Sequence, residues 1–250
     1  QGTYANTGFE TWGASGLAGV WAEENTRDSL FSAMRRKETF ATTGNRMKVR
    51  FFGGFETNKL DLNDENLVKA AYASSSTMGG EILADGEKVP SFLVWAQRDK
   101  HGAPLQRVQI IKGSVNQFDA SPTEVIYDVA CSNGLKVDPT TNRCPDNGAR
   151  VDIETCAFSK DVGSAELKAT WTDPDFNPND RAFYYVRVLE NPTCRWSTWD
   201  ALRRGLAPRP DIHDTIQERA WSSPIWFVPT GSNELPAAQS MQSDLAEYIE

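Results

Sequence analysis

The sequence predicts a mainly β protein, an antiparallel β-sandwich of about seven strands, and three observations lead to this prediction. Several segments alternate apolar and polar residues with a period of two, which is typical of half-buried strands. The segments between them are rich in Pro, Gly, Asn and Asp, the residues that favour turns. The chain has 250 residues, 39% of them hydrophobic and 24% charged, so it is long enough for a large sandwich core.

A helix and a short extended segment precede the predicted sandwich. Residues 22–37 carry Asn25 as a candidate N-cap and end on three basic residues, which suits the C-terminal end of a helix dipole. One face of this helix is apolar and consists of Leu30, Phe31 and Met34. Residues 39–42 are then expected to be extended, and Gly44-Asn45 supplies a turn. Because the helix is amphipathic, its apolar face must pack on a partner.

The predicted strands follow in chain order, together with one further helix. Residues 91–97 and 107–111 alternate on either side of the turn Asp99-Lys100-His101-Gly102 and predict a β-hairpin. Residues 64–75 have apolar side chains at helical spacing after Asn63 or Asp64, and predict a short helix. The remaining strands are predicted at 47–52, 125–129, 165–171, 183–188 and 221–228.

The four cysteines, Cys131, Cys144, Cys156 and Cys194, contain no C-x-x-C pair, which disfavours zinc ribbons and thioredoxin-like sites. Cys131 and Cys144 flank a turn-rich segment that resembles a loop closed at its neck. A disulfide there contributes about 3 kcal/mol in the loop-entropy model. Disulfides form in oxidising compartments, so we expect a periplasmic or secreted protein. The sequence leaves all three pairings open, and also four free thiols in a reducing compartment.

Composition excludes several function classes. The chain carries 26 Lys and Arg against 34 Asp and Glu, a net charge of −8, which argues against a nucleic-acid partner. No apolar run approaches the roughly 18 residues of a membrane span, so none is expected. His101 and His213 are the only histidines, and neither has the spacing of a metal-binding motif. We therefore predict neither a metal site nor another cofactor within this chain.

Two groups of residues are candidate ligand-binding sites, whereas no catalytic residue is identified. Trp196 and Trp199, with Arg195 beside them, can form a platform for sugar rings or cations. The alternative is that these rings cover the edge of the sandwich. At the start of the first helix, Glu24, Asn25 and Arg27 can bind an anion with the help of the backbone N–H groups. The alternative there is simple helix capping.

Five stretches of the sequence together resemble a known family. They are GLAGVWAEENTR at 16–27, RKETFATTG at 36–44, PSFLVWA at 90–96, RAFYYVRVLENPTCRWS at 181–197 and AWSSPIW at 220–226. These motifs are similar to those of a large bacterial family of unknown function, mostly exported, that is related to the PHP (polymerase and histidinol phosphatase) metal-dependent phosphoesterases. The resemblance extends to about Pro229.

The resemblance implies a division of the chain. Residues 1–45 look like the end of a PHP-type α/β barrel, with the rest of the barrel missing, and residues 46–229 look like its C-terminal β-sandwich with long Cys-containing loops. Residues 230–250 form a polar tail that can include a short helix. The metal ligands of such a barrel precede the segment matched by Gln1, so a divalent metal is expected in the missing N-terminal barrel. That barrel is then also the expected partner of the apolar helix face.

The expected function follows from this division. The chain is expected to be the C-terminal accessory region of an exported PHP-like metal-dependent hydrolase, inactive by itself, that acts on a phosphoester or related ester. It would form one edge of the active-site mouth near Glu24, Asn25 and Arg27, facing a small-molecule or glycan substrate. Two alternatives remain open: a glycan- or ligand-binding module that uses Trp196 and Trp199, and a purely structural or oligomerisation domain.

Overall fold

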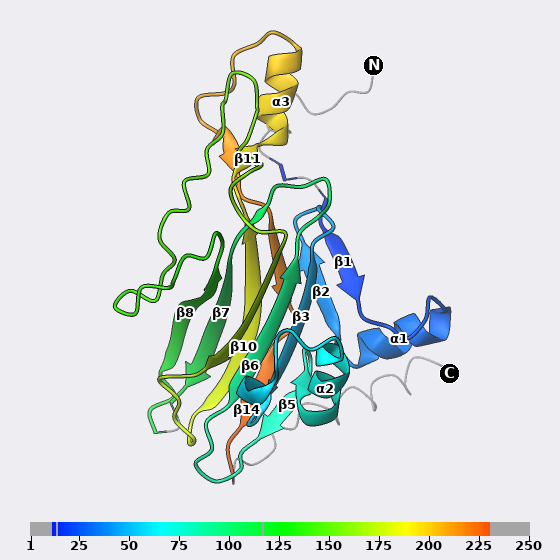
Figure 1. Ribbon diagram of the computed structural model, residues 1–250, viewed down its shortest axis with the longest axis vertical. Helices are drawn as coiled ribbons and strands as arrows, with labels where there is room; N and C mark the ends of the chain where they lie inside the picture. The colour runs from blue at the N-terminus through cyan, green and yellow to red at the C-terminus, as the bar shows by residue number, and fades with distance from the viewer. Residues whose placement is uncertain (1–11, 14, 117, 231–250) are drawn as a thin grey trace, which may run out of the picture.

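A computed structural model describes residues 12–13, 15–116 and 118–230, and within them the chain is mainly β, with fourteen strands and three α-helices (Figure 1). Twelve of the strands belong to two sheets. Sheet A has eight strands: β1 (Leu17–Val20), β2 (Thr39–Thr42), β5 (Glu81–Leu83), β7 (Leu105–Val115), β8 (Pro122–Cys131), β10 (Arg181–Glu190), β13 (Arg219–Ser222) and β14 (Ile225–Val228). Sheet B has four: β3 (Lys48–Gly54), β4 (Ser76–Thr77), β6 (Ser91–Gln97) and β9 (Glu166–Thr172).

Strand β10 organises sheet A. It pairs with β7 along one edge and with β13 and then β14 along the other. Sheet A therefore has the order β8-β7-β10-β13-β2-β1 at one end and β8-β7-β10-β14-β5 at the other, and only the β14–β5 pair is parallel. Sheet B has the order β4-β3-β6-β9 and is antiparallel throughout. The predicted mainly β, antiparallel class is confirmed.

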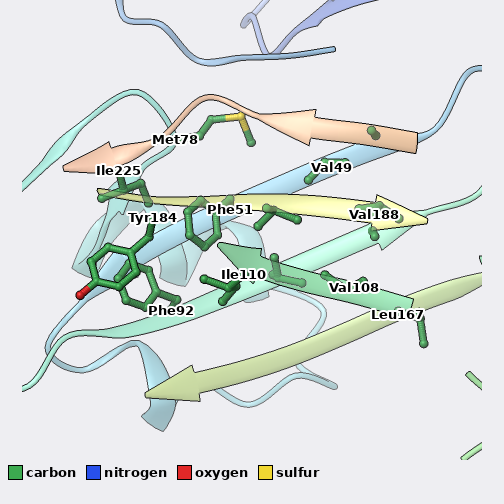
Figure 2. Packing of buried hydrophobic residues seen from close by; sticks show 14 of the residues in the cluster. Val49, Phe51, Met78, Phe92, Val108, Ile110, Leu167, Tyr184, Val188 and Ile225 are labelled. Carbon is green, nitrogen blue, oxygen red and sulfur yellow. The ribbon is translucent and has the colours of Figure 1, made fainter. Parts of the chain in front are cut away.

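The two sheets face each other across one apolar core (Figure 2). Alternate residues of the strands point inward, such as Val49 and Phe51 of β3 and Tyr184 and Val186 of β10, and all four are fully buried. The Phe92 ring of β6 lies 4.3 Å from the Tyr184 ring and 5.5 Å from the Phe51 ring, measured between centroids. Each large apolar side chain buried in this way stabilises the fold by about 1.5–3 kcal/mol. This stacking of two sheets is compatible with the predicted sandwich.

A buried ion pair lies within this core. Lys112 Nζ is 2.7 Å from Asp173 Oδ2, and the two side chains are only 8% and 0% exposed. The Tyr184 hydroxyl donates a 2.7 Å hydrogen bond to the same oxygen of Asp173, and Lys112 donates another to the backbone carbonyl of Asp175. Each charge thus has a counter-charge and hydrogen-bond partners, the condition under which a buried ion pair is tolerated.

The predicted hairpin between residues 91–97 and 107–111 is wrong. Strand β6 lies in sheet B between β3 and β9, whereas β7 lies in sheet A between β10 and β8. The turn that follows β6 therefore crosses from one sheet to the other. Asp99 holds this turn in place, because its carboxylate accepts hydrogen bonds from the backbone N–H groups of Arg46 (2.7 Å) and His101 (2.9 Å). Alternation identifies a strand but does not identify its partner.

Two helices are shorter than predicted and begin at other caps. Helix α1 spans Arg27–Arg35 and is capped by Thr26, whose Oγ1 accepts a hydrogen bond from the N–H of Ser29, so Asn25 is not the cap. Helix α2 spans Leu67–Ser74 and begins after Asn66, which makes no side-chain capping bond. A short 3-10 turn, Thr57–Lys59, precedes it.

Two further predictions are corrected near the C-terminal end of the described chain. The single strand expected at 221–228 is two strands, since Pro224 has no N–H to donate and β13 and β14 pair with different parts of β10. The segment between β10 and β13, expected as one of the long Cys-containing loops, contains helix α3 (Trp196–Arg203) and the strand pair β11 (Thr193–Cys194) and β12 (Thr215–Ile216).

The N-terminal segment joins sheet A. Strand β1 pairs with β2, and β2 pairs with β13 in the register Thr42–Ala220. Helix α1 connects β1 to β2, and its side chains Phe31 and Met34 are 60% and 54% exposed. Whether residues 1–45 end a barrel stays a prediction. The helix expected within 230–250 and residues 1–11 lie outside the described residues.

Candidate anion-binding cleft

Two disulfides shape one end of the molecule. Cys131–Cys144 closes the loop that the sequence suggested, and Cys156–Cys194 ties the long segment between β8 and β9 to β11, near α3 (Figure 1). A cleft of about 800 Å³ lies between this segment, the ends of β7 and β13, and the β11–β12 pair. The covalent bonds therefore hold its walls in place. Two disulfides are also consistent with a periplasmic or secreted protein.

Three arginines lie on the outer face of sheet A, and two of them, Arg107 and Arg219, line this cleft. Their sequence neighbours on β7, β10 and β13 point into the core, so Arg107, Arg187 and Arg219 point outward. Arg107 and Arg219 both lie opposite Leu189 of β10, one on each side. Since neighbouring strands are about 4.8 Å apart, the two backbones are separated by about 10 Å. An anion can contact both side chains at that separation.

One carboxylate forms ion pairs with a member of this group and with a fourth arginine. Buried Asp128 has its oxygens 3.7 Å from Arg107 Nε and 3.5 Å from Arg143 Nη1. It also accepts hydrogen bonds from Gln109 Nε2 (2.6 Å) and from the backbone N–H of Cys144 (2.7 Å). Among the described residues, no other carboxylate lies within 4.0 Å of these four guanidinium groups. The cluster therefore carries excess positive charge.

This excess acts on the pKa of Arg187 in the same direction as its burial. Burial lowers the pKa of its guanidinium, and the nearby positive charges of Arg219, Arg107 and Arg143 lower the pKa further. Arg187 Nε donates a hydrogen bond to a neutral acceptor, Gln109 Oε1, at 2.7 Å. The whole chain has a net charge of −8, so the local charge of this cluster is opposite in sign to the charge of the chain as a whole. A bound anion would relieve the repulsion.

A row of glutamines orients Arg107. Its Nη1 donates to Gln106 Oε1 at 2.6 Å, and that oxygen also accepts from Gln217 Nε2 at 2.9 Å. Gln217 in turn donates to the backbone carbonyl of Glu190. Arg107 Nε has no hydrogen-bond acceptor within the described part of the chain. The guanidinium is thus held by Gln106 on one side and by the charge of Asp128, 3.7 Å from Nε, on the other.

A buried carboxyl group lies beside the cleft. Glu190 at the end of β10 is 1% exposed, and its Oε1 has no hydrogen-bond partner among the described residues. Burial is the main cause that raises the pKa of this carboxyl to about 7, and the carboxylates of Glu218 and Asp99 act in the same direction. Glu190 is therefore largely protonated at mildly acidic pH.

Of the three residues of the predicted aromatic platform, one lines the cleft. Arg195 lies in its wall, where the guanidinium donates to Ser197 Oγ (2.7 Å) and to the backbone carbonyl of Trp12 (2.8 Å). Trp196 donates its indole N–H to the same carbonyl. Trp199 is 38% exposed on α3, with the Arg203 guanidinium 5.3 Å from its ring centroid. The two rings belong to one helix but do not line the cleft.

The second predicted group lies elsewhere. Glu24, Asn25 and Arg27 are at the start of α1, a different part of the molecule from α3 (Figure 1). Glu24 accepts a hydrogen bond from the Thr26 hydroxyl at 3.0 Å, and its N–H donates to Ser29 Oγ at 3.3 Å. Its observed contacts are thus those of helix capping, and the structure does not bring the two predicted groups together.

Sequence reasoning missed the arginine cluster. Arg107 and Arg187 stand at the polar positions of alternating strands, where a solvent-exposed basic residue is ordinary. Arg187 and Arg219 follow Arg107 by 80 and 112 positions in the chain. Only the pairing of β7, β10 and β13 brings the three onto one face of the sheet. The sequence showed only that these arginines occupy the polar positions of alternating strands, not that they lie together.

Two kinds of feature are absent from the part of the chain that the structure describes. They contain no group of three or more His, Cys, Asp and Glu side chains placed to hold a metal ion. No helix among them is long and apolar enough to cross a bilayer.

Comparison with known proteins identifies a family. Searches of curated proteins and of solved structures found no match to this chain. A family model, by contrast, covers most of the sequence, from residue 1 to residue 229. The chain therefore belongs to the family described as protein of unknown function (DUF3604).

Proposed function

We propose that this chain is an accessory region of an exported hydrolase and that its cleft binds the anionic group of the substrate, a phosphoester or related ester. The observation that carries the proposal is the charge imbalance at a cleft of about 800 Å³. Arg107, Arg195 and Arg219 line it, whereas Asp146 is the one carboxylate of its described lining and is paired with Arg150. Guanidinium donors match the oxygens of phosphate, sulfate and carboxylate groups in two parallel hydrogen bonds, and they remain charged at every physiological pH.

Binding would use the arginines from three directions. Arg107 and Arg219 flank the anion from neighbouring strands, and Arg187 adds positive charge from the adjacent row of the sheet. Asp128 holds Arg107 and Arg143 in position without neutralising the whole group. The chain thus orients a ligand, and this alone accelerates a reaction only when a catalytic centre is nearby.

The hydrolase half of the proposal rests on the motif resemblance alone. In this interpretation residues 1–45 complete a PHP-type barrel and residues 46–229 form the β-sandwich beside it. A divalent metal bound by the rest of that barrel would activate water for hydrolysis. The residues described here supply no ligand set for such a metal. Their proposed contribution is therefore limited to binding the anionic group.

Calorimetric titration of residues 1–250 with inorganic phosphate and phenyl phosphate at low ionic strength tests the binding. We expect saturable binding that weakens as salt is added. Arg219→Gln should weaken it about tenfold, because one charge-assisted hydrogen bond contributes about 1.5–3 kcal/mol. Arg203→Gln on α3 is the matched control and should bind as the original chain does. Equal affinity for all three proteins, or no binding by any of them, would contradict the proposal.

Hydrolysis of p-nitrophenyl phosphate with added Mn²⁺ tests the other half. We expect no turnover by residues 1–250, and turnover by a longer protein that includes the upstream barrel. Turnover by the 250-residue chain would show a catalytic site that we have not identified. An upstream sequence without H-x-H and D-x-H motifs would refute the link to PHP enzymes.

A second candidate is the glycan-binding module on α3. The partly exposed ring of Trp199 is the observation in its favour. Titration of the intrinsic tryptophan fluorescence with a panel of neutral glycans should then shift the emission, and Trp199→Ala should remove the shift. If no glycan changes the emission, this candidate is rejected.

A further inference from the structure

Strand β10 carries a continuous outward-facing row that leads away from the arginines. Phe183, Tyr185 and Arg187 alternate with the core residues Tyr184 and Val186, so they share the outer face of sheet A. Side chains on one face of a strand repeat every two residues, or about 6.7 Å. The row therefore spans about 13 Å from Phe183 to Arg187. It ends beside the arginine cleft.

The start of this row is an aromatic surface. Phe183 pairs with Trp226 of β14, and their ring centroids are 5.3 Å apart. The Tyr185 ring lies 6.3 Å from the Phe183 ring and is nearly parallel to it, with an angle of 17°. Phe183 lies directly over Gly113 of β7, where any Cβ would collide with the ring. Trp226 is 44% exposed. The missing side chain at Gly113 thus allows Phe183 to lie flat on the sheet.

We propose that the aromatic surface of Phe183, Tyr185 and Trp226 and the arginine cleft form one elongated site for an anionic polysaccharide. The inference rests on the proposed function for its anion-binding end. One face of a pyranose ring presents C–H groups, which pack on the negative face of an aromatic ring. A sulfate or carboxylate on a neighbouring sugar then reaches the guanidinium groups of Arg187, Arg107 and Arg219. The two parts of the site recognise the two chemical features of such a polymer.

The compartment favours a polysaccharide over the other polyanion that fits this surface. A single-stranded nucleic acid also stacks on aromatic rings and follows a cationic groove. The net charge of −8 repels both polyanions and does not distinguish them. The two disulfides are consistent with an oxidising compartment, where extracellular glycans are found. A nucleic acid is therefore an alternative outcome of the test.

A ligand-length series measures the contribution of the aromatic surface. Residues 1–250 are titrated by calorimetry with sulfated heparin-derived di- and hexasaccharides, a galacturonate hexamer, neutral cellohexaose and a dT oligomer. We expect at least one of the two anionic hexamers to bind at least tenfold more tightly than the disaccharide. Trp226→Ala should remove this gain and leave disaccharide affinity within twofold. Phe31→Ala, which removes an exposed aromatic ring on α1, is the matched control and should keep the gain.

The variants separate this inference from the proposed function. Arg219→Gln should weaken both the disaccharide and the longer ligands, since it acts at the anion-binding end. If the disaccharide binds but no longer ligand gains affinity, the elongated site is wrong and the anion-binding cleft stands. Equal binding of cellohexaose, or tighter binding of the dT oligomer than of any sugar, overturns the polysaccharide assignment. If no anion binds at all, both proposals fail.

Discussion

Two charged regions of this molecule are built in opposite ways. Inside the core, Lys112 and Asp173 face each other at 2.7 Å, and the oxygen that Lys112 contacts also accepts a hydrogen bond from Tyr184. On the outer face of sheet A, Asp128 pairs with Arg107 and Arg143, and the positive charges of Arg219, Arg107 and Arg143 all act on Arg187. In the first region the two charges balance and are buried. In the second region positive charge is in excess, and two of the arginines line a cleft.

The difference separates stability from binding. A balanced buried pair contributes little in itself, but the loss of one partner leaves an uncompensated charge in the interior. An unbalanced surface cluster raises the free energy of the folded state slightly, and the loss of one member lowers that repulsion. Mutations in the core should therefore affect folding, whereas mutations in the arginine cluster should affect ligand affinity. Four predictions test this contrast.

The largest effect is expected at the core pair. Lys112→Met leaves the Asp173 carboxylate buried without a counter-charge, so the free energy of unfolding should fall by about 3–5 kcal/mol. Urea denaturation at pH 7 measures the change. Lys88→Met is the control, because Lys88 pairs with Asp85 on the surface and its loss should change stability by less than about 1 kcal/mol. Equal effects of the two substitutions would contradict the contrast.

The next largest loss of stability is expected when either of the disulfides beside the cleft is removed. Replacing Cys156 and Cys194 together by Ser should lower the free energy of unfolding by about 4 kcal/mol, since that bond closes a loop of 38 residues. The same replacement of Cys131 and Cys144, which are 13 residues apart, should lower it by about 3 kcal/mol. Urea denaturation of the two double variants measures the difference. A larger loss for the shorter loop would show that the loop-entropy account is wrong here.

Glu190 is expected to have an intermediate effect that depends on pH. Its folded-state pKa is about 7 against an ordinary 4.5, so the folded state holds the proton more tightly. The stability contributed by the protonated form is fully present below pH 4.5 and is lost as pH rises through 7, a total on the order of 3 kcal/mol. Glu190→Gln should therefore be more stable than the original chain at pH 8, with the difference disappearing toward pH 4.5.

Urea denaturation at pH 5 and pH 8 gives the comparison for Glu190. The exposed Glu65→Gln serves as control and should show no such dependence on pH. If Glu190→Gln has the same effect at both pH values, the carboxyl does not titrate in the way that its burial implies.

The sequence predicted the fold class better than it predicted the site. The alternation of side chains was sufficient to identify β3, β6, β7 and β10 as strands, although only β10 is buried at alternate positions and β6 and β7 are buried on both faces along most of their length. It was not sufficient to pair β6 with β9, or to keep β6 apart from β7, since pairing depends on contacts that are distant in the chain. The cleft is formed by such distant pairing. Arg195 was identified only because it adjoins a visible Trp pair, whereas Arg107 and Arg219 had no local signal.

Arg219→Gln should have the smallest effect on stability and is the sharpest test of the contrast. Arg219 is exposed and adds to the positive charge around Arg187, so its neutral replacement removes repulsion without breaking an ion pair. The free energy of unfolding should stay within about 0.5 kcal/mol of the original or rise slightly at low ionic strength. In about 1 M salt, where charges are screened beyond about 3 Å, any gain should vanish. A loss of more than about 1 kcal/mol would mean that Arg219 is structural, and the cluster would then need no ligand to explain it.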